Sequence, residues 1–161
     1  MTTTDDPSAG SGRAAADAGW VTVTNEGAAY RSEMRAGRHT LAVDEPASLG
    51  GDDTGPTPYD LLLGAVAGCM AITLRMYARR KGWPLEAVVV AMRTARSHAA
   101  DCAECVDHAD RPGALPALRL ERRLELRGPL TDEQRRRLAE IADRCPVKQA
   151  LKHGVAVADG G

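Results

Sequence analysis

The stretch LLLGAVAGCMAITLRMYARRKGW, residues 61–83, decides the fold, because its first fourteen residues carry no charge and a cysteine stands among them. Thr57 and Pro58 before it are typical of a helix start, and Gly82 is typical of a helix end. We therefore expect one helix from about residue 58 to about residue 80. Because it is apolar on nearly all sides, its first four turns are expected to be buried in the centre of the protein.

The cysteine in this helix, Cys69, has two interpretations. A thiol in an apolar helix is usually inert, since burial raises its pKa and keeps it protonated. Its own helix offers no basic neighbour, so a reactive Cys69 would need a cation from elsewhere in the fold. Gly64 and Gly68 lie four residues apart on one face of the helix, where a second backbone can approach closely.

A second cysteine, Cys145, has local reasons to be reactive. It stands just before Pro146, which is well suited to begin a helix. A helix N-terminus offers free N–H donors and about half a positive charge, both of which lower a thiol pKa. The flanking Arg144 and Lys148 act in the same direction. From the residues alone, each cysteine is either packing or part of a reactive pair.

The rest of the chain alternates between strand-like and helix-like segments. Residues 1–18 are small and polar and predict a disordered tail, followed by one domain at 19–161. The order ββ(β)–α–ββ–αα–β is that of an α+β domain with long helices against an antiparallel sheet. The expected elements are strands at 19–25, 28–35 and 38–44, a loop at 47–58, strands at 85–96 and 117–128, helices opening at Thr131 and Pro146, and a last strand at 155–159.

Composition narrows the functional classes. The chain has 161 residues with 43% hydrophobic, 3% aromatic and a net charge of −1. So few aromatics and so balanced a charge argue against nucleic-acid binding. The uncharged run is shorter than the roughly 18 residues that a membrane-spanning helix needs, and the first residues do not form a secretory signal. We therefore expect a cytoplasmic protein that binds neither nucleic acid nor membrane.

Two segments carry a specific family resemblance. They are GPTPYDLLLGAVAGCMAITLRMYARRKGWPL at 55–85 and ADRCPVKQALKHGVAV at 142–157. Together with Asp44-Glu45-Pro46 and Gly50-Gly51 they make the chain resemble the OsmC/Ohr family of osmotically induced and organic-hydroperoxide-resistance proteins. The resemblance covers about residues 37–157 and is closest to the branch with a DEP…GG…GP.PY[ED]LLL…C signature.

This resemblance implies a fold and an activity. The fold is an OsmC-like α+β domain that forms an intertwined homodimer, with a long central helix and the active sites at the subunit interface. Cys69 matches the peroxidatic cysteine and Cys145 the resolving one, in a thiol-dependent peroxidase that uses organic hydroperoxides, an external dithiol reductant and no cofactor. The alternative is a non-catalytic OsmC-like domain that binds small molecules.

The resemblance also implies an activating arginine, and here the chain departs from the pattern. The best-known members hold that arginine with a glutamate ten residues before the first cysteine, where this chain has Tyr59. Asp60 is nine residues before, which at about 100° per residue places it opposite Cys69, with Tyr59 about 80° away. Asp60 can replace the glutamate only if the helix begins later or its first turn is irregular. The alternative is that Tyr59 forms the hydrogen bond to the arginine or to the substrate.

Two further groups of residues complete the candidate sites: the arginines of the strand region before Asp44-Glu45-Pro46, and a segment with a C-x-x-C motif. Arg38 is the first choice for the activating arginine and Arg35 the second. The segment SHAADCAECVDH is either a solvated loop, a redox pair of cysteines or a tetrahedral zinc site, and a single C-x-x-C is a weak zinc signal. We expect no metal site; its ligands would be His98, Cys102, Cys105 and His108.

Overall fold

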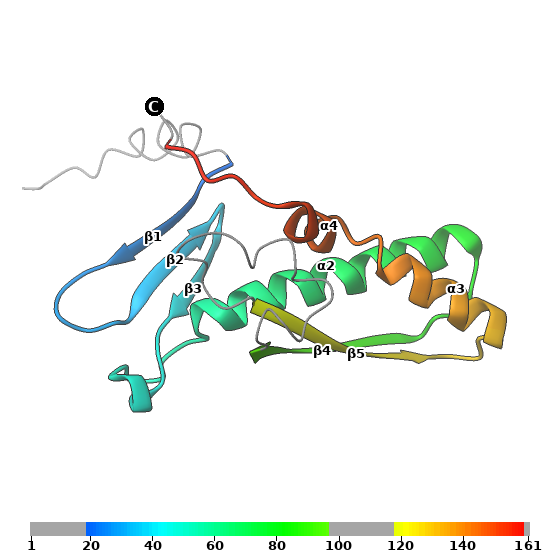
Figure 1. The fold of residues 1–161 in the computed structure, drawn as a ribbon, viewed down its shortest axis with the longest axis horizontal. Coiled ribbons are helices and arrows are strands. Elements are labelled where there is room, and N and C mark those ends of the chain that lie inside the picture. The colour runs from blue at the N-terminus through cyan, green and yellow to red at the C-terminus, as the bar shows by residue number, and fades with distance from the viewer. Residues whose placement is uncertain (1–18, 97–117, 160–161) are drawn as a thin grey trace, which may run out of the picture. The chain divides into compact units, whose positions relative to one another are not determined.

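The computed structural model describes residues 19–96 and 118–159 (Figure 1). The predicted tail at 1–18 and the C-x-x-C loop lie outside these residues. The described chain forms two compact units whose boundary falls between Leu61 and Leu62. The first unit holds three strands and a loop, and the second holds most of the long helix, a two-stranded sheet and two further helices. Antiparallel sheets and long helices confirm the predicted fold class.

The sheet of the first unit is antiparallel with the order β1-β2-β3. Strand β1 spans Val21–Asn25, β2 spans Ser32–Ala36 and β3 spans His39–Val43. Val23 pairs with Met34, and Met34 with Leu41, in a continuous register. The third strand, which the sequence left open, is therefore present.

The DEP…GG…GP signature forms a loop that is organised around one carboxylate. Asp44 is only 2% exposed, and it accepts hydrogen bonds from the backbone N–H groups of Glu45, Asp52 and Thr54 and from the Thr54 hydroxyl at 2.8–3.3 Å. The Thr54 bonds are the main cause that lowers the pKa of Asp44 below its ordinary value. A Cβ at Gly51 would lie 1.9 Å from the Glu45 carbonyl oxygen, so this position has room only for glycine. Residues Ala47–Leu49 within the loop form the 3-10 turn η1.

Helix α2 spans Pro58–Lys81, one residue longer at its C-terminus than predicted. The Thr57 hydroxyl caps it by accepting a bond from the Asp60 N–H at 3.2 Å. Gly82 ends the helix with a φ of +64°, and Trp83 N–H returns to the Ala78 carbonyl at 2.9 Å. The predicted start and end of this helix are confirmed, because both depend on local residues.

The second sheet pairs β4 (Ala87–Arg96) with β5 (Leu118–Arg127) in antiparallel register. Helix α2 lies along one face of this ribbon (Figure 1). Alternate residues of both strands pack on the core beneath the helix, as the leucine alternation of β5 predicted. They are Val88, Val90 and Met92 of β4 and Leu120, Leu124 and Leu126 of β5.

Helices α3 (Asp132–Ala142) and α4 (Pro146–His153) follow. The predicted capping box of α3 is present: the Thr131 hydroxyl accepts from Gln134 N–H, and the Gln134 side chain accepts from Thr131 N–H. The predicted strand at 155–159 is wrong. These residues have no regular structure, and Val157 is 96% exposed. The valine alternation is that of a strand, but the described residues offer it no neighbouring strand to pair with.

The expectation that the first turns of α2 are buried on all sides is also wrong for the described chain. Only one face is buried, through Val66, Met70, Leu74 and Ala78. On the other face Ile72 and Met76 are 61% and 67% exposed. This 24-residue helix is long and apolar enough to span a membrane, but the core helix of a folded protein can have the same length and hydropathy. Its four buried side chains pack in the core of the second unit.

Candidate thiol site

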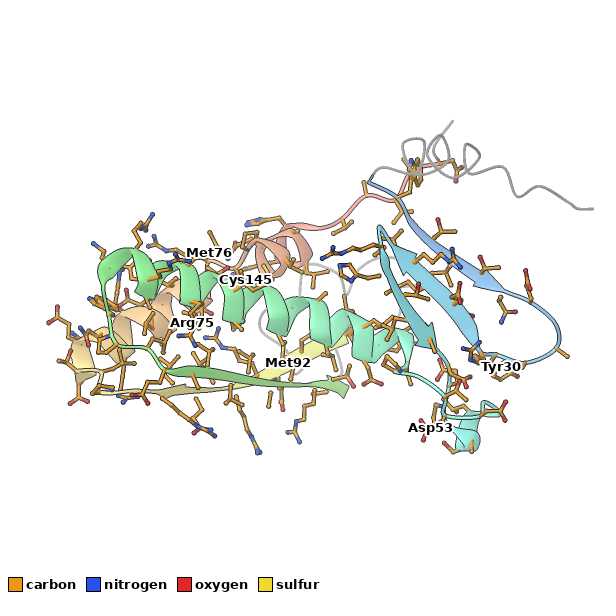
Figure 2. All side chains as sticks on the ribbon, turned by 180° about the vertical axis from the view of Figure 1, so that it is seen from behind. Tyr30, Asp53, Arg75, Met76, Met92 and Cys145 are labelled. Carbon is orange, nitrogen blue, oxygen red and sulfur yellow. The ribbon has the colours of Figure 1, made fainter. Side chains whose placement is uncertain are left out.

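The structure brings Cys69 and Cys145 together in the second unit. Cys69 lies midway along α2 and is half-buried, whereas Cys145 is fully buried between α3 and α4. Figure 2 shows Cys145 where α4 meets α2. Both thiols are free, and a hydrogen bond between the two side chains is among the causes that lower the pKa of Cys69 and raise that of Cys145. The two cysteines are therefore close enough to interact directly.

Apolar packing holds the second cysteine in place. Helix α3 turns Leu138, Ile141 and Ala142 into the core, where they are at most 6% exposed. The chain then leaves α3 and Cys145 becomes the N-cap residue of α4. The Cys145 sulfur also makes a long contact, 3.9 Å, with the Val66 carbonyl oxygen of α2. The joint between the two helices is thus packed directly against α2, one turn before Cys69.

The surroundings shift the pKa values of the two thiols in opposite directions. Burial tends to raise the pKa of Cys69, but hydrogen bonds from the Val147 N–H, the Cys145 thiol and the Thr73 hydroxyl outweigh it and lower that pKa below 9.0. Burial raises the pKa of Cys145 above 9.0, and its hydrogen bond to Cys69 adds to that effect. The thiolate is therefore favoured on Cys69 and disfavoured on Cys145.

This result corrects the expectation that the N-terminus of α4 lowers the pKa of the Cys145 thiol. The Val147 N–H, which belongs to the first turn of α4, donates to Cys69. Cys145 receives N–H bonds from Val147 and Lys148, but its complete burial outweighs them. The helix end thus supplies Cys69 with part of the stabilisation that its own helix lacks.

Sequence reasoning missed three residues at this site. Thr73 lies one turn after Cys69 and also donates to the Cys69 carbonyl at 2.8 Å; its i+4 spacing was a usable signal. Val147 acts through its backbone, which no side-chain pattern reveals. Arg122 occupies the core-facing position of β5 between Leu120 and Leu124, and this interruption of the leucine alternation could have been noticed.

Charged groups surround the joint between α3 and α4. Arg122 is 3.0 Å from the Asp143 carboxylate, and its guanidinium also donates to the Met70 sulfur at 3.4 Å. The Lys148 ammonium is 2.6 Å from the same carboxylate oxygen of Asp143. The Lys148 bond is the largest cause that lowers the pKa of Asp143. Asp143 is therefore ionised and doubly paired.

The other predicted site residues lie in the first unit. Arg38 belongs to the Gly37-Arg38 turn that joins β2 to β3, not to a strand as expected, because Gly37 takes a φ of +58° there. Arg35 lies on β2 and pairs with Glu33 at 2.8 Å. Both arginines are exposed.

Tyr59 and Asp60 belong to the first turn of α2. The helix begins at Pro58 and the Asp60 carboxylate accepts bonds from the Thr57 N–H and hydroxyl at 3.0 and 2.7 Å. Neither condition under which Asp60 could replace the family glutamate is met, since the helix begins at Pro58 as predicted and its first turn is regular, with the Leu61 N–H bonded to the Thr57 carbonyl at 3.1 Å. The Tyr59 side chain is 58% exposed, and its hydroxyl has no hydrogen bond within the described part of the chain.

The proposed metal ligands His98, Cys102, Cys105 and His108 lie outside the described residues. Among residues 19–96 and 118–159, no group of three or more His, Cys, Asp or Glu side chains could hold a metal ion. A cleft of about 460 Å³ lies between the end of α2 and α3 and is lined by Tyr77, Trp83, Arg136 and Arg137, among others. Neither cysteine lines it.

Comparison with known proteins places this architecture. The OsmC-like protein family model matches residues 50–158, more than half of the chain. No curated protein sequence matches it. Similar solved structures include an OsmC-like protein from Mycoplasma pneumoniae, 18% identical, covering 82% of this chain and 85% of that one with a TM-score of 0.62.

Two further structures are named as organic hydroperoxide resistance proteins. The one from Legionella pneumophila is 19% identical and covers 82% of this chain and 88% of its own, with a TM-score of 0.57. The one from Elizabethkingia anophelis is 18% identical and covers 81% and 86%, also with a TM-score of 0.57. At these identities the likeness shows the fold, whereas the family model matches the sequence itself. The chain belongs to the OsmC-like protein family.

Proposed function

We propose that this protein is a thiol-dependent peroxidase that reduces organic hydroperoxides, with Cys69 as the peroxidatic and Cys145 as the resolving cysteine. The observation that carries the proposal is the hydrogen-bonded thiol pair, in which the surroundings lower the pKa of Cys69 and raise that of Cys145. An unperturbed thiol with a pKa near 8.5 is only about 3% thiolate at pH 7, so a lowered pKa is what a peroxidatic cysteine needs. Family membership and the two hydroperoxide-resistance neighbours agree with this choice.

The reaction proceeds in two steps within the protein. The Cys69 thiolate attacks the distal oxygen of the hydroperoxide, the O–O bond breaks, and the departing alkoxide takes a proton from water to give an alcohol. Cys69 becomes a sulfenic acid. The Cys145 sulfur, already adjacent, then displaces hydroxide from that sulfenic acid; the thiol proton leaves with it as water and a disulfide remains.

An external dithiol completes the cycle. It reduces the Cys69–Cys145 disulfide by thiol–disulfide exchange and is itself oxidised to a disulfide. Free thiols and a dithiol reductant fit a reducing compartment, so we place the protein in the cytoplasm. No metal or organic cofactor takes part in this cycle, because sulfur supplies both electrons. Apolar side chains around the pair, such as Val66 and Val147, favour a substrate with an alkyl or acyl group.

The proposal includes a homodimer in which the exposed face of α2 meets a second copy. Ile72 and Met76 present large apolar surfaces on this face. A Cβ added at Gly64 or Gly68 would meet nothing within 4 Å in the described chain, so a second backbone has room to approach there. In such a dimer Arg38 is our candidate for the guanidinium that stabilises the Cys69 thiolate, with Arg35 second. Tyr59 is our candidate donor to that arginine or to the hydroperoxide.

The second candidate function is a non-catalytic domain that binds small molecules. The observation in its favour is that Asp60 caps α2 and Tyr59 stands where the family glutamate would be, so the glutamate that holds the arginine is lacking. The α4 N–H groups beside Cys69 favour the peroxidase instead, since they stabilise a thiolate without that glutamate. Reaction with peroxide separates the two functions.

Stopped-flow mixing with an alkyl hydroperoxide tests the proposal. We expect rapid loss of the Cys69 thiol in the wild type and in Cys145→Ser, and a disulfide in the wild type only. In Cys145→Ser a cyclic diketone should trap the sulfenic acid on Cys69, as mass spectrometry of the peptides would show. Cys69→Ser is the matched control and should consume no peroxide at this site. Thiol loss no faster than that of free cysteine would favour the binding domain.

A further inference from the structure

The starting observation is a charged residue on the core-facing side of β5. Leu120, Leu124 and Leu126 share this side and pack on the core, and Arg122 lies between them in the alternation. Its side chain is 26% exposed. A guanidinium in such a position costs stability unless its donors are satisfied. Here each of its two terminal nitrogens has a partner: Met70 of α2 at 3.4 Å and Asp143 at 3.0 Å.

Asp143 is the residue at which these contacts converge. One carboxylate oxygen receives both Arg122 of β5 and Lys148 of α4. The Asp143 backbone carbonyl accepts a further bond from the Gln149 side-chain amide at 2.5 Å. Lys148 and Gln149 belong to the first turn and a half of α4. The beginning of α4 is therefore tied to the end of α3 and, through Arg122, to β5 and α2.

The position of this helix end matters for the thiols. The Val147 N–H donates to Cys69, and the N–H groups of Val147 and Lys148 donate to Cys145. The favourable effect of a helix N-terminus on a negative charge falls off within the first turn. A small displacement of α4 would therefore weaken the stabilisation of the Cys69 thiolate.

We propose that Asp143 is a positioning residue that, by holding Arg122 and Lys148 together, fixes the first turn of α4 with its N–H groups directed at Cys69. Its role in peroxide reduction rests on the proposed function, but its effect on the thiol does not. The charged side chains at the joint between α3 and α4, or paired with it, are Arg122, Asp143, Arg144 and Lys148. Helix α2 itself carries no charge between residues 61 and 74.

The direction in which one substitution shifts the pKa of Cys69 distinguishes a positioning role of Asp143 from a simple charge effect. Asp143→Asn removes a negative charge and leaves Arg122 and Lys148 without it. Through space alone, that change would favour the Cys69 thiolate and lower its pKa. If Asp143 acts by positioning α4, the same substitution has the opposite effect, because the N–H donors move away from the sulfur.

The test is the pH profile of Cys69 alkylation in the reduced, full-length protein, followed by mass spectrometry so that each cysteine is observed separately. We compare the rate at pH 7 with the plateau at high pH, which removes effects of altered access. We expect this ratio to fall about two- to fivefold in Asp143→Asn, the range that a helix end contributes. Arg122→Lys keeps the charge but loses the two-sided contact with Met70 and Asp143, and we expect a fall in the same direction.

Glu140→Gln is the matched control. Glu140 also lies on α3 and pairs with Arg137 at 2.6 Å. Within the described chain its side chain makes no hydrogen bond or ion pair with α4, so its substitution should leave the ratio unchanged. An unchanged or increased ratio in folded Asp143→Asn would overturn the proposal. If Asp143→Asn does not fold, as judged by circular dichroism, an unchanged ratio in Arg122→Lys would overturn it. Alkylation needs no peroxide, so a failure here is distinct from a failure of the proposed function.

Discussion

The backbone N–H of Val147 donates a hydrogen bond to the sulfur of Cys69, although the two residues belong to different helices. The bond is possible because Val147 follows Pro146 in the first turn of α4, where backbone N–H groups have no partner in their own helix. Cys145, one residue before Pro146, faces the same sulfur. One short helix start therefore supplies both the donor that favours a thiolate on Cys69 and the second thiol.

Our first prediction concerns the pH at which each thiol reacts. Because the pKa of Cys69 is lowered and that of Cys145 is raised, alkylation of Cys69 should reach half its plateau below pH 9.0 and alkylation of Cys145 above it. The measurement is peptide-resolved alkylation of the reduced protein over a pH series. Thr73→Val should move the Cys69 midpoint upward, because it removes one of the donors. Coincident midpoints for the two cysteines would contradict the asymmetry.

A second prediction concerns acid stability and Asp44. Its folded-state pKa is lowered from 3.8, mainly by the Thr54 hydroxyl and N–H. A carboxylate of this kind stabilises the fold above its unfolded pKa, and the contribution is lost as the pH falls through the folded value. Asp44→Asn should therefore lower the midpoint of urea unfolding at neutral pH, and the difference from wild type should shrink in acid.

The control for this experiment is Asp52→Asn. Asp52 lies in the same loop and is exposed, and its own carboxylate has no hydrogen bond within the described part of the chain. We expect its unfolding midpoint to match the wild type at both pH values. A difference between Asp44→Asn and wild type that persists unchanged in acid would show that shape, not ionisation, is what Asp44 contributes.

A third prediction concerns self-association through α2. A negative charge at position 76 would lie within the proposed dimer interface. Met76→Glu should weaken dimerisation by at least about tenfold, equivalent to about 1.4 kcal/mol. Analytical ultracentrifugation over a concentration series measures this. Leu49→Glu is the control, because Leu49 is 64% exposed on the η1 turn. Equal association constants for the two variants would argue against α2 as the interface.

A fourth prediction concerns the capping box of α3. Thr131→Ala removes the hydroxyl that accepts from the Gln134 N–H at 3.2 Å. It should destabilise the protein by about 1 kcal/mol, or about 2–4 °C in melting temperature. Thr131→Ser retains the oxygen and should melt close to the wild type. Because α3 carries Leu138 and Ile141 into the core, a loss much larger than this would mean that the whole helix depends on its cap.

Much of the fold could be predicted because its signals are local. The ends of α2 were predicted to within a residue from Thr57, Pro58 and Gly82. The start of α3 was predicted from the capping box of Thr131 and Gln134. The last strand was predicted wrongly. The alternation at Val155 and Val157 is compatible with a strand, but a strand also needs a neighbouring strand to which it can hydrogen-bond. The burial of α2 was overstated for a similar reason, since an apolar composition does not say how many neighbours are present.

The thiol site was less accessible to sequence reasoning. The pairing of Cys69 with Cys145 came from family resemblance alone, and the structure places the two together. The direction of the pKa shifts could not be predicted, because it depends on which sulfur the α4 N–H groups reach and how deeply each is buried. Arg122 could be noticed in the sequence as a charged residue among alternating leucines. Its partner Asp143 is remote in sequence and could not be identified.

The loop around Asp44 is held together by its own residues. A chain can therefore keep the DEP…GG…GP signature whether or not it has an active thiol pair. Every hydrogen bond that the carboxylate accepts comes from within the loop, and Gly51 is required by a neighbouring carbonyl. None of these contacts involves a residue of the thiol site. A search anchored on DEP…GG…GP would therefore gather proteins that share a scaffold, including any that have lost their thiols, and catalysis would have to be judged from the cysteines and the residues around them.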